Sequence, residues 1–108
     1  MTFNPVITLV DANGYPASAS TNATVAAGTG TTVVKASPGR LVAAVVTGAA
    51  STGALTFYDN ASTGSGTVIG VVPSGAGSGT RWPFETPAVN GITAVGAAGS
   101  AAVTVSYS

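Results

Sequence analysis

Two residue types that carry much of enzyme chemistry are missing from this chain, which has no histidine and no cysteine. Without histidine a Ser-His-Asp arrangement cannot be built. Without cysteine there are no disulfides and no thiolate metal sites, which is compatible with assembly in a reducing cytoplasm. The acidic residues Asp11, Asp59 and Glu85 are too few and too far apart in sequence to form the supported carboxylate pair of a glycosidase. The sequence therefore predicts a protein that is not an enzyme and that has no cofactor and no metal ion.

Charged side chains are also scarce, at 6% of the 108 residues, whereas an average soluble domain has about 25%. The cations Lys35, Arg40 and Arg81 balance the three acidic residues, so the net charge is zero. A thinly charged surface of zero net charge favours association. We therefore predict a homo-oligomer, or a subunit that is covered by other proteins. The alternative is a soluble monomer that its 16 threonine and 11 serine hydroxyls keep hydrated.

The low charge and the local composition also exclude several classes of partner. Three cations spread along the chain cannot neutralise a nucleic-acid backbone, so no nucleic-acid partner is expected. Residues 86–108 carry no charge, but their glycines, hydroxyls and Pro87 make a poor membrane span, so no membrane partner is expected. Residues 1–5 have neither the positive region nor the apolar core of a secretory signal, which disfavours export by that route.

Residues that favour β-structure dominate what is present. Val and Thr contribute 31 residues, whereas Glu and Lys occur once each and Gln is absent. The length suits one domain. Short apolar segments separated by Gly, Ser and Pro predict an all-β protein, an antiparallel β-sandwich of about seven or eight strands. Residues 1–30 are poor in large apolar groups and are predicted to form an extended N-terminal arm, with a strand at 6–10, while residues 31–108 form the sandwich.

The strands of the sandwich are predicted from local patterns. Residues 31–36 favour a strand, residues 55–59 and 103–107 alternate between apolar and polar side chains, and residues 92–95 follow an Asn-Gly turn. Residues 37–40 predict a type II turn, in which Pro38 fixes one φ and Gly39 supplies a positive φ.

Two further segments, residues 41–46 and 68–72, are apolar without alternation, which predicts strands that are covered on both faces. One cover is the core of the sandwich. The other is either another subunit or a loop of the same chain, and both alternatives stay open. If a subunit covers them, the interface residues are Leu41, Val45, Val46, Val68, Ile69 and Val71.

The bulkiest cluster of the chain is Arg81-Trp82-Pro83-Phe84. Trp and Arg often anchor protein interfaces, so Arg81, Trp82 and Phe84 are interface candidates as well. Two other roles stay open: Trp82 could stack on a sugar, or the aromatic rings could plug one end of the sandwich. Arg40 is expected to form an ion pair with Asp59 or Glu85.

Two weak motifs have simpler explanations than a binding site. Residues 11–14 resemble the opening of a calcium loop but lack the distal Glu, so an Asx turn is expected. The glycine-rich residues 74–79 have no Lys to contact a phosphate and are expected to form a loop.

Five segments resemble small virion proteins of tailed bacteriophages, of the head decoration or cement type. They are residues 37–42 (SPGRLV), 53–62 (GALTFYDNAS), 66–70 (GTVIG), 87–92 (PAVNGI) and 102–107 (AVTVSY). The resemblance covers residues 31–108. It rests on the short sequences of turns and strands rather than on a catalytic motif.

The resemblance implies a jelly-roll-like sandwich, often a homotrimer, that sits on the outside of a viral capsid and braces its subunits. The implied partners are the major capsid protein or other virion subunits, and the implied location is the virion, assembled in the cytoplasm of the bacterial host. The alternative is a receptor- or glycan-binding module of a tail fibre or tail tip, for which Trp82, Tyr58 and the glycine-rich loops would supply the site.

Overall fold

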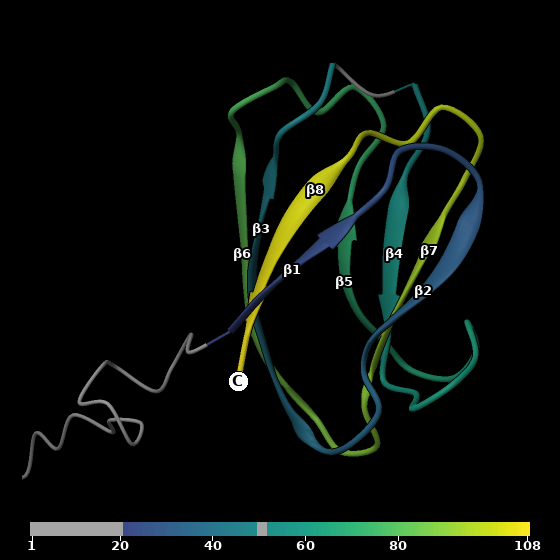
Figure 1. The fold of residues 1–108 in the computed structure, drawn as a ribbon, viewed down its shortest axis with the longest axis vertical. Coiled ribbons are helices and arrows are strands. Elements are labelled where there is room, and N and C mark those ends of the chain that lie inside the picture. The colour runs from purple at the N-terminus through teal and green to yellow at the C-terminus, as the bar shows by residue number, and fades with distance from the viewer. Residues whose placement is uncertain (1–20, 50–51) are drawn as a thin grey trace, which may run out of the picture.

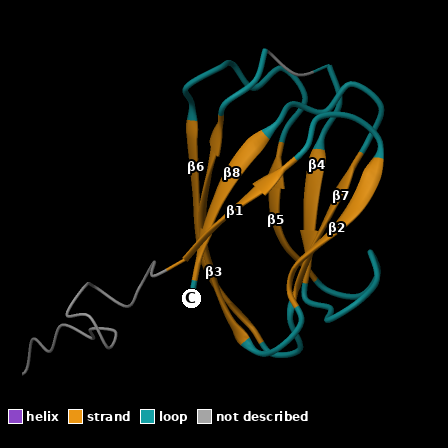
Figure 2. Cartoon of the chain, viewed as in Figure 1, coloured by secondary structure: helices purple, strands orange, loops and turns teal. Residues whose placement is uncertain are grey.

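The structure is a computed structural model that describes residues 21–49 and 52–108. The regular elements of these residues are eight β-strands in two antiparallel sheets (Figure 2). The strands are β1 Thr21–Val25, β2 Gly30–Lys35, β3 Gly39–Val46, β4 Leu55–Tyr58, β5 Val68–Val72, β6 Arg81–Ala88, β7 Ile92–Gly96 and β8 Val103–Tyr107. The predicted all-β, antiparallel sandwich is confirmed.

The first four strands of the chain pair with the last four. One sheet has the order β1-β8-β3-β6 and the other has the order β2-β7-β4-β5. The first strand pairs with the last, β2 pairs with β7, β3 with β6, and β4 with β5. Successive strands therefore pass from one sheet to the other, except that β4 and β5 are neighbours in the same sheet. Figure 1 shows the two sheets facing each other.

The core lies between the sheets and is built by alternation along the strands. In β8, Val103 and Val105 are buried, whereas Thr104 and Ser106, which alternate with them, point outward. The largest fully buried side chains are those of Phe57, Leu41, Leu55 and Ile92. Burial of one such side chain contributes about 1.5–3 kcal/mol, so a few of them hold the two sheets together.

Aromatic packing closes one side of the sandwich. The rings of Phe57 and Phe84 lie 5.5 Å apart at 54°, a tilted arrangement that aromatic pairs favour. The Phe84 ring also lies against Gly70, where an added Cβ would be 2.8 Å from the ring. Because Phe84 belongs to β6 and Gly70 to β5, this contact joins the edges of the two sheets.

The predicted arm extends too far along the chain. Thr21–Val25 form β1, which pairs with β8, and Gly30 begins β2. Only Val25 of β1 is buried, so an edge strand of small polar residues forms here through its pairing and needs little apolar surface. Residues 1–20, with the predicted strand at 6–10 and the predicted turn at 11–14, lie outside the described residues.

The predicted type II turn at residues 37–40 is wrong. Gly39 is not among the glycines with positive φ, and it is the first residue of β3. Its role is to allow a close approach, because a Cβ at this position would collide with the backbone oxygen of Ser108 and lie 2.9 Å from Nζ of Lys35. Glycine is required here for space rather than for a turn conformation.

Candidate interaction surfaces

The side chains predicted as interface residues divide into two groups in the structure. Leu41, Val46 and Ile69 point into the core and are enclosed by the same chain, so they present no side chain to a partner. The others lie on outer faces: Val45 is half-buried on β3, and Val68 and Val71 on β5 are exposed. Val68 and Val71 share a face although they are three residues apart, because the pairing of β4 with β5 shifts register between them.

The cluster at residues 81–84 alternates along β6. Trp82 and Phe84 are half-buried and pack against the core. The indole Nε1–H of Trp82 donates to Thr80 Oγ1 at 3.1 Å, and the Thr80 hydroxyl donates to the Gly77 carbonyl oxygen at 2.6 Å. The indole is thus held by its own chain, which favours the structural role of the aromatic residues. Arg81 points outward and is exposed.

The outer face of the sheet β2-β7-β4-β5 is partly covered by the loop after β4. The loop, residues 59–67, is closed by a hydrogen bond from Asp59 N to Thr67 O at 2.8 Å. Thr93 on this face is fully buried, and its hydroxyl donates to Asn60 O at 2.8 Å. Gly64 lies so close to Val95 that a Cβ would collide with the valine. A loop of the same chain therefore covers β4 and β7.

Two side chains at the start of this loop hold it in place. The carboxylate of Asp59 accepts hydrogen bonds from the N–H of Asn90 at 2.7 Å and of Gly91 at 3.4 Å. The Asn90 bond is the main cause that lowers the pKa of Asp59. The Asn60 Oδ1 accepts from the N–H groups of Ser62 and Thr63, both at 2.9 Å. The Asp59 contacts link the loop to the turn between β6 and β7, and the Asn60 contacts hold the backbone of the loop itself.

The exposed valines of this face lie on either side of the loop. Val68 and Val71 on β5 are 50% and 42% exposed, and Val33 on β2 is 44% exposed. Because β2 and β5 are opposite edges of the sheet, these valines do not form one patch. The second cover predicted for residues 68–72 is thus not supplied by the described residues of this chain.

The outer face of the sheet β1-β8-β3-β6 is lined mainly by small and hydroxyl-bearing residues. On three of its four strands, β1, β8 and β3, the residues of this face include Thr24, Thr104, Ser106 and Ala43. Val42 and Ala43 are buried without belonging to the core cluster. This face carries no charged side chain over β1 and β8.

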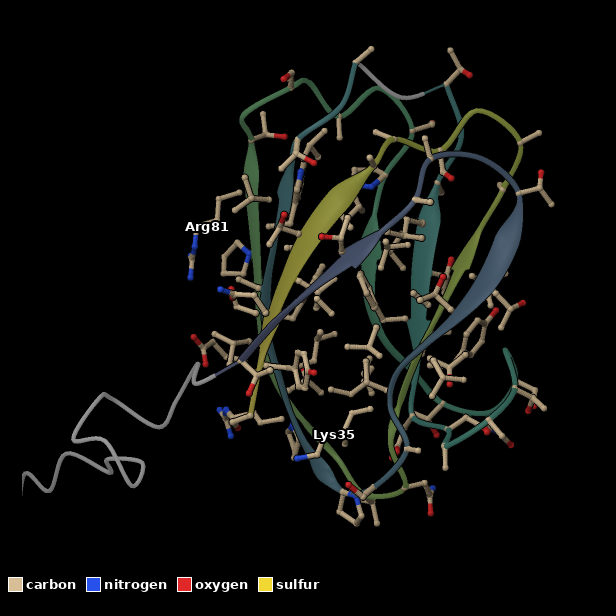
Figure 3. All side chains as sticks on the ribbon, in the orientation of Figure 1. Lys35 and Arg81 are labelled. Atoms are coloured by element: carbon tan, nitrogen blue, oxygen red, sulfur yellow. The ribbon has the colours of Figure 1, made fainter. Side chains whose placement is uncertain are left out.

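The charged residues of this sheet lie at its β6 margin. Arg40 Nε and Glu85 Oε2 form an ion pair at 3.5 Å, and Arg40 Nη2 donates to the Glu85 carbonyl oxygen at 2.9 Å. The pairing of Arg40 with Glu85 was one of the two alternatives that we predicted; Asp59 binds backbone N–H groups instead. Figure 3 shows Lys35 and Arg81 at separate places on the molecule, so these two cations do not share a patch.

Comparisons with family models, with curated proteins and with solved structures found no match for this chain. Within the described residues, no group of three acidic residues could hold a metal ion, and no helix is long and apolar enough to cross a membrane.

Proposed function

We propose that this chain is a structural protein of a phage virion, a decoration or cement subunit that binds the outer surface of the head and stabilises it through protein–protein contacts. The observation that carries the proposal is the scarcity of charge on the outer faces of both sheets. Of the few charged side chains on the strands, Arg40 and Glu85 neutralise each other. Such a surface can be covered by a partner with little cost of desolvating ions.

The connectivity of the strands supports the same proposal. The pairing of the first strand with the last, the second with the seventh and the third with the sixth is what we expect of a jelly roll. A jelly roll is the fold that the resemblance to decoration proteins implies. On this proposal the partners are the major capsid protein or other virion subunits, the chain is a homo-oligomer, and its location is the virion.

A glycan-binding module of a tail fibre or tail tip is less well supported. Such a module would need Trp82 as a stacking platform for a sugar ring. The Trp82 ring instead packs against the core, and its N–H donates to Thr80. The geometry therefore favours the decoration role over the receptor-binding role.

The copy number in purified virus particles tests the proposal. A decoration subunit is expected in many copies, in proportion to the capsid subunits, whereas a fibre module is present in few copies. Quantitative gel densitometry of purified particles measures this ratio, with the major capsid protein as the internal standard. A copy number matching the tail fibres, together with binding to host cells or sugars, would contradict the decoration role.

A further inference from the structure

The free edges of the two sheets are not equally protected. Val46 of β3 turns both of its backbone groups toward the start of β6, because its N–H donates to Thr80 O and its C=O accepts from Gly79 N. Ala44, two residues earlier on β3, therefore faces its β6 partner Trp82 in the same way, and Pro83, the next residue of β6, lies on the free edge. Arg40 exchanges hydrogen bonds with Ser108, the residue that directly follows β8, on its other side. Pro87, the β6 partner of Arg40, therefore also lies on the free edge. Proline offers no N–H to a further strand, and β6 is therefore blocked.

The backbone of β1 can be oriented by the same reasoning. Arg40 and Ser108 exchange both backbone hydrogen bonds at 3.0 Å, and Thr47 N donates to Ala102 O at 2.9 Å. Even-numbered residues at the end of the chain thus turn toward β3, and odd-numbered residues of β8 turn toward β1. Ala23 pairs with Val105, so Ala23 turns toward β8. Asn22 and Thr24 then turn their N–H and C=O groups toward the free edge.

Within residues 21–49 and 52–108, the free edge of β1 has none of the usual protection against further pairing. Its five residues, Thr-Asn-Ala-Thr-Val, include no proline and no charge, and its register with β8 runs without a bulge. The other edges differ: β2 has a register shift and ends at Lys35, and β5 lies beside β6 through the contact of Phe84 with Gly70. A regular, uncharged edge strand is a template for pairing with another strand.

We propose that β1 pairs antiparallel with β1 of a second copy of this chain, about a two-fold axis that passes through Ala23. In this register Asn22 lies opposite Thr24 of the second copy, and Thr24 lies opposite Asn22 of the second copy. These are the residues whose N–H and C=O groups face the free edge, so the register and the orientation of the backbone agree. The four-stranded sheet β1-β8-β3-β6 of one copy then continues into the same sheet of the second copy, across a symmetric dimer.

The side chains of β1 suit this pairing as well. Ser106 Oγ donates to Asn22 Oδ1 at 3.1 Å, which leaves the amide N–H groups of Asn22 to donate to the Thr24 hydroxyl of the second copy. Ala23 is small where the strand meets its own copy. Because none of the five residues is charged, the symmetric pair has no repulsion between like charges.

Sedimentation of the full chain alone, without virus heads, tests this pairing. The wild type is expected to be a dimer. Thr24→Pro removes an N–H on the free edge and none that faces β8, so it is expected to be a monomer, while the matched control Thr24→Ala stays a dimer. A monomeric wild type, or a Thr24→Pro dimer with native circular dichroism, would overturn the proposal.

Hydrogen exchange of the wild type gives a second readout that does not depend on the folding of a variant. The amides of Asn22 and Thr24 are expected to exchange slowly, and to exchange faster on dilution. Fast exchange at both amides at every concentration overturns the pairing. The same holds if the chain forms a trimer, as the resemblance implies, and both amides still exchange fast in it. The β1 pairing does not rest on the decoration role. If the chain does not dimerise through β1, the decoration role is still tested by the copy number in purified particles.

Discussion

The carboxylate of Asp59 joins the loop after β4 to the turn before β7, and its hydrogen bond from Asn90 N–H lowers its pKa below the ordinary value of 3.8. A carboxylate with a lowered folded-state pKa stabilises the fold above its unfolded pKa, and this contribution is lost as the pH falls through the folded pKa. We predict that the wild type loses stability as the pH falls below 3.8. Asp59→Asn, which keeps an oxygen acceptor without a charge, should lose less over that window. Urea titrations at several pH values measure the difference; identical pH profiles would contradict it.

Gly70 is a position where one added methyl group has a large effect. A Cβ there would be 2.8 Å from the Phe84 ring, which already packs against Phe57. We predict that Gly70→Ala lowers the free energy of unfolding by about 1–3 kcal/mol, the usual cost of overpacking. Gly30→Ala is the matched control, because a Cβ at Gly30 meets no atom within 4 Å, and it should change stability by less than about 1 kcal/mol. Chemical denaturation of both variants checks this, and equal effects would show that the contact with Phe84 is not responsible.

β6 contains a residue in a conformation that glycine favours. Glu85 has φ 51°, at a bulge in the pairing of β3 with β6. Its ion pair with Arg40 is about half exposed and is worth about 0–1 kcal/mol. Glu85→Gly and Glu85→Ala both remove the ion pair, but Ala keeps the left-handed conformation, which costs about 1 kcal/mol for a residue with a side chain. We predict that Glu85→Gly is more stable than Glu85→Ala by about 1 kcal/mol, measured by thermal unfolding. A Glu85→Ala variant as stable as Glu85→Gly would mean that the positive φ carries no cost.

Strands with clear apolar patterns could be predicted from the sequence, and the two without such patterns could not. The segments around residues 31–36, 41–46, 55–59, 68–72 and 103–107 are strands in the structure. Residues 21–25 fall within the predicted arm because residues 1–30 are poor in large apolar groups. The sequence predicts no strand at residues 81–88, where Pro83 and Pro87 argue against a central strand. Both are edge strands, where pairing on one side is sufficient.

The candidate surface was predicted less well than the fold. An uninterrupted apolar run such as residues 41–46 does not show which side chains face the core, so Leu41 and Val46 were proposed as interface residues although they lie in the core. The cover over β7 could not be predicted either. It depends on contact of Thr93 with Asn60, 33 residues away in the sequence, for which no local pattern exists.

The low charge of the whole molecule has a consequence for how it associates. Among the described residues the one ion pair joins Arg40 and Glu85, and salt screens mainly exposed charges. We predict that sodium chloride changes self-association little, whereas ammonium sulfate strengthens it, because sulfate favours the burial of surface. Sedimentation velocity in the two salts makes the comparison. Dissociation by sodium chloride would instead indicate an interface held by charges.

Binding to the virus head is the most direct measurement of a role in protein–protein contact. To test the proposed decoration role, the purified chain is mixed with emptied phage heads, the heads are pelleted, and the chain in the pellet is quantified over a range of concentrations. We predict saturable co-sedimentation at a fixed ratio to the capsid subunits. Heads that pellet without the chain, even at the highest concentration, would contradict the decoration role.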